Sequence, residues 1–214
     1  MIVWLLLAVG TASPQQLIAQ VQAAYRDGGD LEATFTHVYI DKLRGKKRVE
    51  TGKLWAKRDG RVRWSYLDPV PKDFVFTGER AFFYEPDNAQ VTVFEQFKDS
   101  PLFEALRFLW GQGSLSEVFA IKPCNQHCDL GTPGETVIEL WPKKEIPSVD
   151  HSVVVVDPKI LRILRSVVFD PLGNRTEYHF RDVKLGAKVP AAMFKFDIPE
   201  GVNILKASAD ESGK

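Results

Sequence analysis

The sequence predicts a single, mainly β domain that carries a few helices. Apolar and polar residues alternate along several short segments, which is the period of a half-buried strand. The turns between these segments are short and rich in Gly, Pro, Asp and Asn, and such turns join antiparallel strands because parallel strands need long crossovers. With 44% hydrophobic residues among 214, the chain can bury a substantial core. No repeat or linker divides it, so we expect one domain over residues 13–205.

The composition argues against nucleic-acid binding and against catalysis. The 28 basic and 28 acidic side chains cancel, whereas a protein that neutralises phosphates carries a basic excess. There is neither a Gly-x-Ser-x-Gly elbow nor a phosphate-binding glycine loop. The histidines fall on separate predicted elements without metal-ligand spacing: His37, His127, His151 and His179. We therefore expect no enzyme, no metal site and no cofactor.

Residues 1–12 predict a signal peptide. Residues 2–9 form an apolar run that is too short for a membrane span of about 20 residues, and Gly10-Thr11-Ala12 supplies the small residues of a cleavage site. No Lys or Arg precedes the run, so the start site stays open, and a buried N-terminal strand is the alternative. No Cys follows the run and no other segment suits a membrane helix. We expect an exported protein that is neither lipid-anchored nor membrane-integral.

Cys124 and Cys128 are the only cysteines, and they flank Asn-Gln-His. An oxidising compartment favours a small disulfide between them. The alternative is a zinc site with His127 as a third ligand, but the loop offers no fourth ligand. The spacing also differs from that of a haem attachment site. We expect the disulfide.

A helix is predicted over residues 14–27. Ser13, Pro14 and Gln16 form a capping box with Pro at the first helical position. Apolar residues then recur at helical spacing: Leu17, Ile18, Val21 and Tyr25. Gly28 and the glycine after it end the helix.

Strand signals dominate residues 31–97. Strands are expected at 31–36, 62–66, 74–76, 81–84 and 90–97. The segments Phe74–Phe76 and Phe82–Tyr84 are apolar on both faces, unlike a sheet with one side in water. We therefore expect the second face to be covered by helices, by curvature of the sheet or by a ligand. A plain aromatic core is the alternative.

Two further helices and a second series of strands are predicted after residue 97. Residues 102–110 contain only two polar side chains, Glu104 and Arg107, so this helix must be covered on most sides. A second capping box at Ser114–Glu117 predicts a helix that includes Phe119 and Ile121. Strands are expected at 136–141, 151–157, 160–169 and 175–185, with a last strand over Phe194, Phe196 and Ile198 and a loose polar tail at 206–214.

Several segments together resemble one known family. They are Thr51–Arg58, Val62–Tyr66 with Asp68-Pro69, Thr77–Pro86 with Gln90–Val93, Ser100-Pro101-Leu102, and the ending Phe194–Val202. In this order they closely resemble the outer-membrane lipoprotein carrier family, LolA. The resemblance covers essentially the whole chain after the predicted signal peptide, and it is specific in combination rather than through a single motif.

The resemblance implies an incomplete, strongly bent antiparallel β-barrel with an apolar cavity covered by an α-helical lid. In this family the cavity takes the acyl chains of lipoproteins from an inner-membrane ABC transporter and delivers them to an outer-membrane receptor. It implies a periplasmic location, and a shuttle between two membranes is most simply a monomer. The candidate cavity residues are Trp55, Val62, Trp64, Phe74, Phe76, Phe83, Leu102, Phe103, Leu106 and Leu109.

Arg58 aligns with the arginine that ties the lid closed in this family through hydrogen bonds to helix backbone. A guanidinium has five donors and can satisfy several free carbonyls at a helix end. The alternative is an exposed arginine at a strand end, because Lys57 and Arg61 are close by. Two other functions remain open from the sequence: a half-barrel sensor or regulator of the cell envelope, and a carrier of free lipid.

Overall fold

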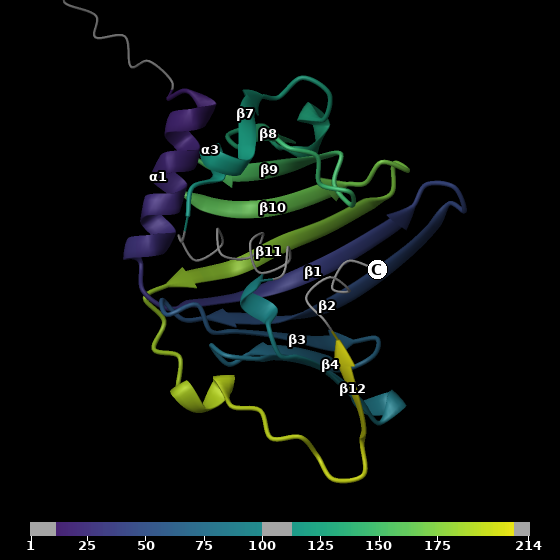
Figure 1. Cartoon of the computed structure of the whole chain (residues 1–214). Coiled ribbons are helices and arrows are strands. Elements are labelled where there is room, and N and C mark those ends of the chain that lie inside the picture. The colour runs from purple at the N-terminus through teal and green to yellow at the C-terminus, as the bar shows by residue number, and fades with distance from the viewer. Residues whose placement is uncertain (1–11, 100–112, 208–214) are drawn as a thin grey trace, which may run out of the picture.

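The fold is one long, bent sheet with an N-terminal helix, α1 (Pro14–Asp27), packed alongside one part of it (Figure 1). The computed structural model describes residues 12–99 and 113–207. The first six strands are β1 (Leu31–Asp41), β2 (Lys46–Ala56), β3 (Val62–Asp68), β4 (Lys72–Phe76), β5 (Ala81–Glu85) and β6 (Gln90–Phe94). The others are β7 (Phe119–Pro123), β8 (Thr136–Pro142), β9 (His151–Asp157), β10 (Arg162–Phe169), β11 (Arg175–Leu185) and β12 (Asn203–Ala207).

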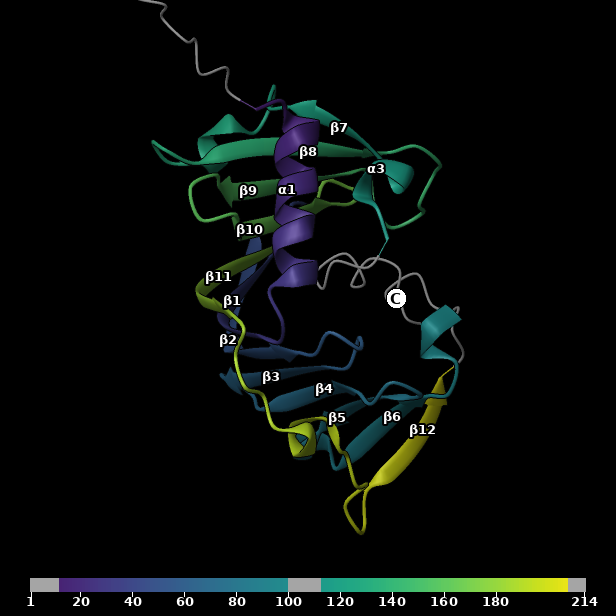
Figure 2. The same cartoon turned by 90° about the vertical axis from the view of Figure 1, so that its left-hand side faces the viewer.

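The sheet is bent but does not close into a barrel. Its order is β12-β6-β5-β4-β3-β2-β1-β11-β10-β9-β8-β7, so β12 and β7 are its two edges. In Figure 2 the strands β7–β10 lie in the upper part of the molecule and β3–β6 in the lower part. Neighbouring strands pair antiparallel, apart from β12, which runs parallel to β6. The predicted open, bent β architecture is confirmed, with this one parallel pair as a correction.

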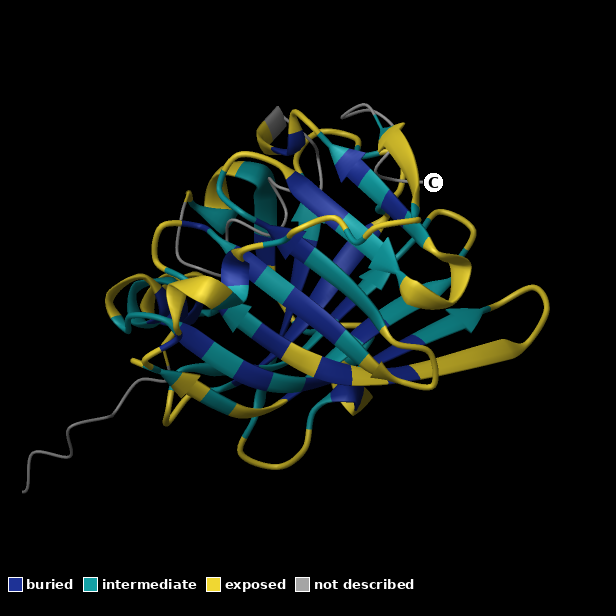
Figure 3. Cartoon of the chain, turned by 90° about the horizontal axis from the view of Figure 1, so that it is seen from below, coloured by how far each residue is buried: buried dark blue, intermediate teal, exposed yellow. Residues whose placement is uncertain are grey.

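Residues on alternate positions of each strand point to two different faces. We call the face against which α1 packs the inner face; on β1 it carries the buried residues Leu31, Ala33 and Phe35. Leu31 and Phe35 belong with Leu17 and Ile18 of α1 to the main core. The other face is the outer face. Figure 3 shows buried residues alternating with half-buried and exposed ones along several strands. The core therefore lies inside the bend of the sheet.

Side-chain contacts across the inner face show how sharply the sheet bends. Strands β3 and β11 are separated by β2 and β1, which in a flat sheet places them about 14 Å apart. Yet the rings of Trp64 on β3 and Tyr178 on β11 lie 5.2 Å apart. Gly52 on β2 allows this approach, because a Cβ there would lie 2.5 Å from the ring of Phe35. A side chain at Gly52 would push the aromatic rings out of the bend.

The outer face carries two smaller cores, each covered by an irregular segment. Residues 124–135 cover one core, built from Leu130, Val153, Val155 and Val167. Residues 187–202 cover the other, where Phe82, Val91 and Val93 pack against Phe196 and Val202. Two short helices lie in these segments, η4 (Cys128–Leu130) and η5 (Ala191–Phe194). Three others lie between strands elsewhere: η1 (Pro86–Asn88), η2 (Phe97–Asp99) and α3 (Leu115–Val118).

The structure confirms helix α1 and corrects the predicted second capping box. In α1 the Ser13 side chain and the Gln16 side chain bond reciprocally to backbone, as predicted. Ser114 makes no such cap, and α3 ends at Val118. Ile121 belongs to β7 instead, opposite Leu140 of β8. Pairing with β8 outweighs the local helical signal.

The end of the chain was also assigned wrongly in part. The alternation of Phe194 and Phe196 predicted a last strand, but these residues form η5 and an extended crossing of the outer face. Their side chains pack against the sheet at every second position, which gives a strand-like period without strand pairing. The last strand is β12, and it includes Lys206, which was expected in the loose tail. The predicted signal peptide up to residue 11, the helix at 102–110 and residues 208–214 lie outside the described residues.

Candidate ligand-binding face

The inner face carries a connected group of aromatic rings. Phe35 of β1 makes edge contacts with Trp64 at 5.4 Å and with Tyr66 at 5.0 Å between ring centroids. The ring of Tyr178 contacts those of Phe35 and Trp64. Its hydroxyl is 3.2 Å from that of Tyr66. Phe180 extends the group along β11. Burial raises the pKa of both tyrosines, so both hydroxyls stay protonated and uncharged.

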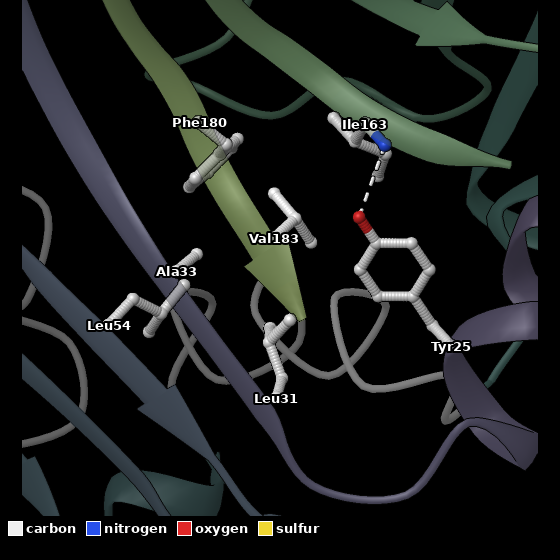
Figure 4. A pocket seen from close by; sticks show the side chains of 7 residues that line it. All are labelled: Tyr25, Leu31, Ala33, Leu54, Ile163, Phe180 and Val183. Atoms are coloured by element: carbon white, nitrogen blue, oxygen red, sulfur yellow. Dashed lines mark hydrogen bonds between the residues drawn. The ribbon is translucent and has the colours of Figure 1, made fainter. Parts of the chain in front are cut away.

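Next to these rings, α1 and the sheet enclose a small apolar pocket (Figure 4). Its lining residues are Tyr25, Leu31, Ala33, Leu54, Ile163, Phe180 and Val183. The enclosed volume is only about 10 Å³, which is about what one water molecule needs. A larger apolar guest can enter this pocket only when the elements around it separate.

Helix α1 is attached to the sheet by an apolar stripe and by a few polar contacts. The hydroxyl of Tyr25 accepts a hydrogen bond of 3.1 Å from the backbone N–H of Ile163 (Figure 4). That N–H lies beside a register irregularity in β10. Near the other end of the helix, the Gln15 amide donates to the carbonyl of Ile121 at 2.8 Å. Burial raises the pKa of Tyr25. These contacts hold α1 over the pocket without joining it to a strand ladder.

A buried ionic cluster interrupts the apolar inner face in the middle of the paired strands β1 and β2. Glu50 is 4% exposed, and its carboxylate accepts from Lys72 Nζ at 2.6 Å and lies 3.1 Å from His37 Nδ1. Arg48 Nε is 3.7 Å away. Burial alone would raise the pKa of Glu50, but the hydrogen bond and charge of Lys72 and the charge of Arg48 outweigh it and lower the pKa. Burial lowers the pKa of His37, and Glu50 opposes this only in part.

This cluster was not among the residues predicted from the sequence. Its members come from three strands, β1, β2 and β4, which only the pairing of the sheet brings together. One signal was available: Glu50 is two residues from Gly52 and four from Leu54, so it shares their face of β2.

The predicted cavity residues divide between the two faces. Five of them lie on the inner face, as their register with one another shows: Val62, Trp64, Phe74, Phe76 and Phe83. Trp55 does not, because it alternates with the inner residues Leu54 and Ala56 and pairs with Arg63 on the outer face. Its assignment to the cavity was wrong. The other predicted cavity residues lie outside the described ones: Leu102, Phe103, Leu106 and Leu109.

Arg58 lies in the turn that joins β2 to β3, and its side chain is exposed. The charged neighbours in and beside this turn have local partners: Lys57 Nζ is 2.7 Å from Asp30 and Arg61 pairs with Asp59 at 2.6 Å. The lid-latch role of Arg58 stays a prediction.

Cys124 and Cys128 form a disulfide, which confirms the expected pairing. His127, the alternative metal ligand, stacks instead on Phe169 at 4.3 Å between ring centroids and on His151 at 5.1 Å. Within residues 12–99 and 113–207, no three Cys, His, Asp or Glu side chains are placed to hold a metal ion.

Comparison with known proteins identifies the family. The family model described as "Outer membrane lipoprotein carrier protein LolA" matches residues 29–197 of this chain. The chain belongs to this family. Its members are carriers rather than enzymes. Among the helices in the described part of the chain, none has both the length and the apolar character of a membrane span.

Individual relatives align with most of this LolA-family protein. A protein from Halorhodospira halophila named "Outer-membrane lipoprotein carrier protein" is 27% identical over 214 residues, covering 99% of this chain and 95% of the relative. One of the same name from Nitrosospira multiformis is 26% identical and covers 88% and 87%. The crystal structure of an uncharacterized conserved protein from Thermus thermophilus shares the fold with a TM-score of 0.55, at 12% identity and with 90% and 98% coverage.

Proposed function

We propose that this LolA-family protein carries acylated lipoproteins through the periplasm. It accepts them from an inner-membrane ABC transporter, shields their acyl chains against the inner face of the sheet and delivers them to an outer-membrane receptor. The observation that supports this proposal most directly is the apolar inner face, against which helix α1 packs beside a small apolar pocket. The family to which the chain belongs supports the choice of lipoproteins as cargo.

The energetics of acyl chains suit such a carrier. Each methylene group buried contributes about 0.8 kcal/mol, so even part of one chain holds cargo firmly. Release to the receptor then requires that closing the empty carrier offsets some of this binding free energy. The hydrogen bond of Tyr25 and a lid latch at Arg58 would supply this closing free energy.

A release assay on spheroplasts tests the carrier function. Purified protein without residues 1–12 is added outside the cells, and acylated lipoprotein is followed into the supernatant. We expect lipoprotein to leave the membrane and to co-elute with this chain. If no lipoprotein is released although the protein takes up an apolar fluorescent probe, the carrier proposal fails, and a sensor or a carrier of free lipid takes its place.

The Arg58→Leu variant tests the latch within that assay. We expect the variant to accept lipoprotein from spheroplasts but to transfer little of it to receptor-bearing outer membranes. Arg61→Leu is the matched control, because its side chain pairs with Asp59 inside the same turn. Transfer by Arg58→Leu at the rate of the unmodified protein would contradict the latch.

A further inference from the structure

Two buried nitrogen atoms on the inner face have no hydrogen-bond partner. They are Nε1 of Trp64 and Nε2 of His37, in residues that are 6% and 9% exposed. Buried polar atoms are almost always bonded, because leaving one unpaired costs free energy. The one other such atom in the described chain, Nε2 of His151, belongs to the outer face. The inner pair therefore needs an explanation.

Both side chains lie against one ring. The His37 ring stacks on Tyr178 with 4.5 Å between centroids, and the Trp64 ring contacts Tyr178 at 5.2 Å. Phe35 closes the group from β1 with an edge contact to Trp64. The two unpaired atoms are thus part of one small aromatic site rather than two separate defects.

The chemistry of the site is that of a donor beside an acceptor. An indole N–H can only donate. In His37, Nδ1 faces the carboxylate of Glu50 at 3.1 Å, which keeps the proton on Nδ1 and leaves Nε2 as an acceptor in the neutral ring. A guest that satisfies Trp64 must therefore bring an oxygen acceptor into otherwise apolar surroundings, which is the chemistry of a carbonyl group at the end of a hydrocarbon chain.

We propose that Trp64 binds the carbonyl-bearing polar end of an acyl-chain ligand, with its Nε1 donating to an acyl ester carbonyl. This inference rests on the proposed carrier function and names the part of the cargo that the protein recognises. Trp64 pairs with Leu54 of β2, and its ring lies 6.4 Å from that of Phe180 between centroids. Leu54 and Phe180 both line the pocket, so a chain whose carbonyl is held at Trp64 begins beside the pocket under α1.

The test compares an ester with an ether. Dioctanoylglycerol and its dioctyl ether analogue have the same chains, but only the ester has carbonyls. Their dissociation constants are measured for the unmodified protein and for Trp64→Phe, which keeps a ring and removes the N–H. We expect Trp64→Phe to weaken ester binding about threefold to tenfold and to leave ether binding unchanged. Trp55→Phe, the same change on the outer face, should leave both unchanged.

Equal losses for ester and ether, or no loss for either, would overturn the inference. If the unmodified protein releases lipoproteins from spheroplasts while Trp64→Phe shows no ester-specific loss, only this inference fails and the carrier function stands. If the unmodified protein binds neither lipid and releases no lipoprotein, both fail.

A second measurement does not depend on folding of the variant. The indole N–H resonance of Trp64 in the unmodified protein should move downfield when the ester is added and not when the ether is added. The same shift with both lipids, or no shift with the ester, would contradict a hydrogen bond to the carbonyl.

Discussion

The inner and outer faces of the sheet are both apolar, but they are covered in different ways. On the inner face, α1 packs through a stripe of side chains and bonds to the sheet through Tyr25 and Gln15. On the outer face, a disulfide closes part of one covering segment and strand β12 anchors the other. An apolar face with a separable cover suits a carrier, whereas one with a fixed cover only stabilises the fold.

The outer segment over residues 187–202 shows how firmly that cover is held. Phe194 is 2% exposed, and Phe196 stacks on Phe82 with 5.0 Å between ring centroids. Arg63 pairs with Asp73 at 2.8 Å and also donates to the carbonyl of Met193 at 3.3 Å. Opening this segment would break its aromatic packing and the hydrogen bond from Arg63 to Met193, and would strain the pairing of the following strand β12 with β6.

The largest effect is expected for Phe194→Ala. Removing this buried ring should lower the free energy of unfolding by about 3–5 kcal/mol, through lost burial and the cavity left behind. Urea unfolding measures it, with the half-exposed Ile204→Ala as a control that should change stability by about 0.5 kcal/mol or less. Binding of an apolar probe to the folded variant should stay unchanged, because Phe194 is on the outer side. A loss of probe affinity would break the distinction between the faces.

Replacing both cysteines, Cys124→Ser with Cys128→Ser, should have the next largest effect. A disulfide with a sequence separation of four restricts the unfolded chain by about 2 kcal/mol, so the variant should lose about that much stability. Thermal unfolding without reductant compares it with the unmodified protein. Equal stability of the two would show that the disulfide does not hold the outer cover in place.

Tyr25→Phe should sharpen the contrast by loosening only the inner cover. It leaves the N–H of Ile163 without its partner, which costs about 1–2 kcal/mol of stability. If α1 must open before a guest enters, uptake of an acyl probe should become about fivefold to thirtyfold faster. Stopped-flow fluorescence measures the rate. Lower stability with an unchanged uptake rate would mean that α1 is not the part that opens.

The smallest effect is expected for the pH dependence of stability, through the protonation of His37. Burial lowers the pKa of His37 below its ordinary value of 6.5, so the unfolded chain binds the proton more tightly and stability falls as the pH drops below about 6.5. Glu50 has a lowered pKa too, but its contribution is lost only below its ordinary value of 4.5.

Unfolding between pH 7.5 and 5 therefore isolates the histidines. His37→Gln should make the loss of stability shallower, by at most about 1.4 kcal/mol per pH unit for one proton. Burial also lowers the pKa of His127 on the outer face, so part of the slope should remain. An unchanged slope in His37→Gln would contradict the shift of His37.

The sequence predicted most of the elements whose signals are local. The capping box of α1, the alternation along β1 and the disulfide all depend on residues close together in the chain. Strand β2 was missed because it begins with the charged run Lys46–Arg48. Strands β7 and β12 were missed because each is defined by its partner strand rather than by its own pattern. Family resemblance alone placed Trp55 in the cavity, although simple alternation with Leu54 puts it on the outer face.

The candidate site was predicted less completely than the fold. Some apolar members of the inner face follow from hydrophobic alternation, so Val62 and Trp64 could be named in advance. The cluster around Glu50 could not, because a charged residue in a strand is ordinarily assigned to solvent. Only the bend of the sheet shows that this carboxylate is buried against His37 and Lys72.

One photo-cross-linking experiment tests most directly which face binds the cargo. A benzophenone-bearing phenylalanine replaces Phe180 on the inner face in one sample and Trp55 on the outer face in another, and each is irradiated with acylated lipoprotein. We predict acyl adducts from position 180 and none from position 55. Adducts from position 55 alone, or equally from both, would contradict binding of the acyl chains under α1.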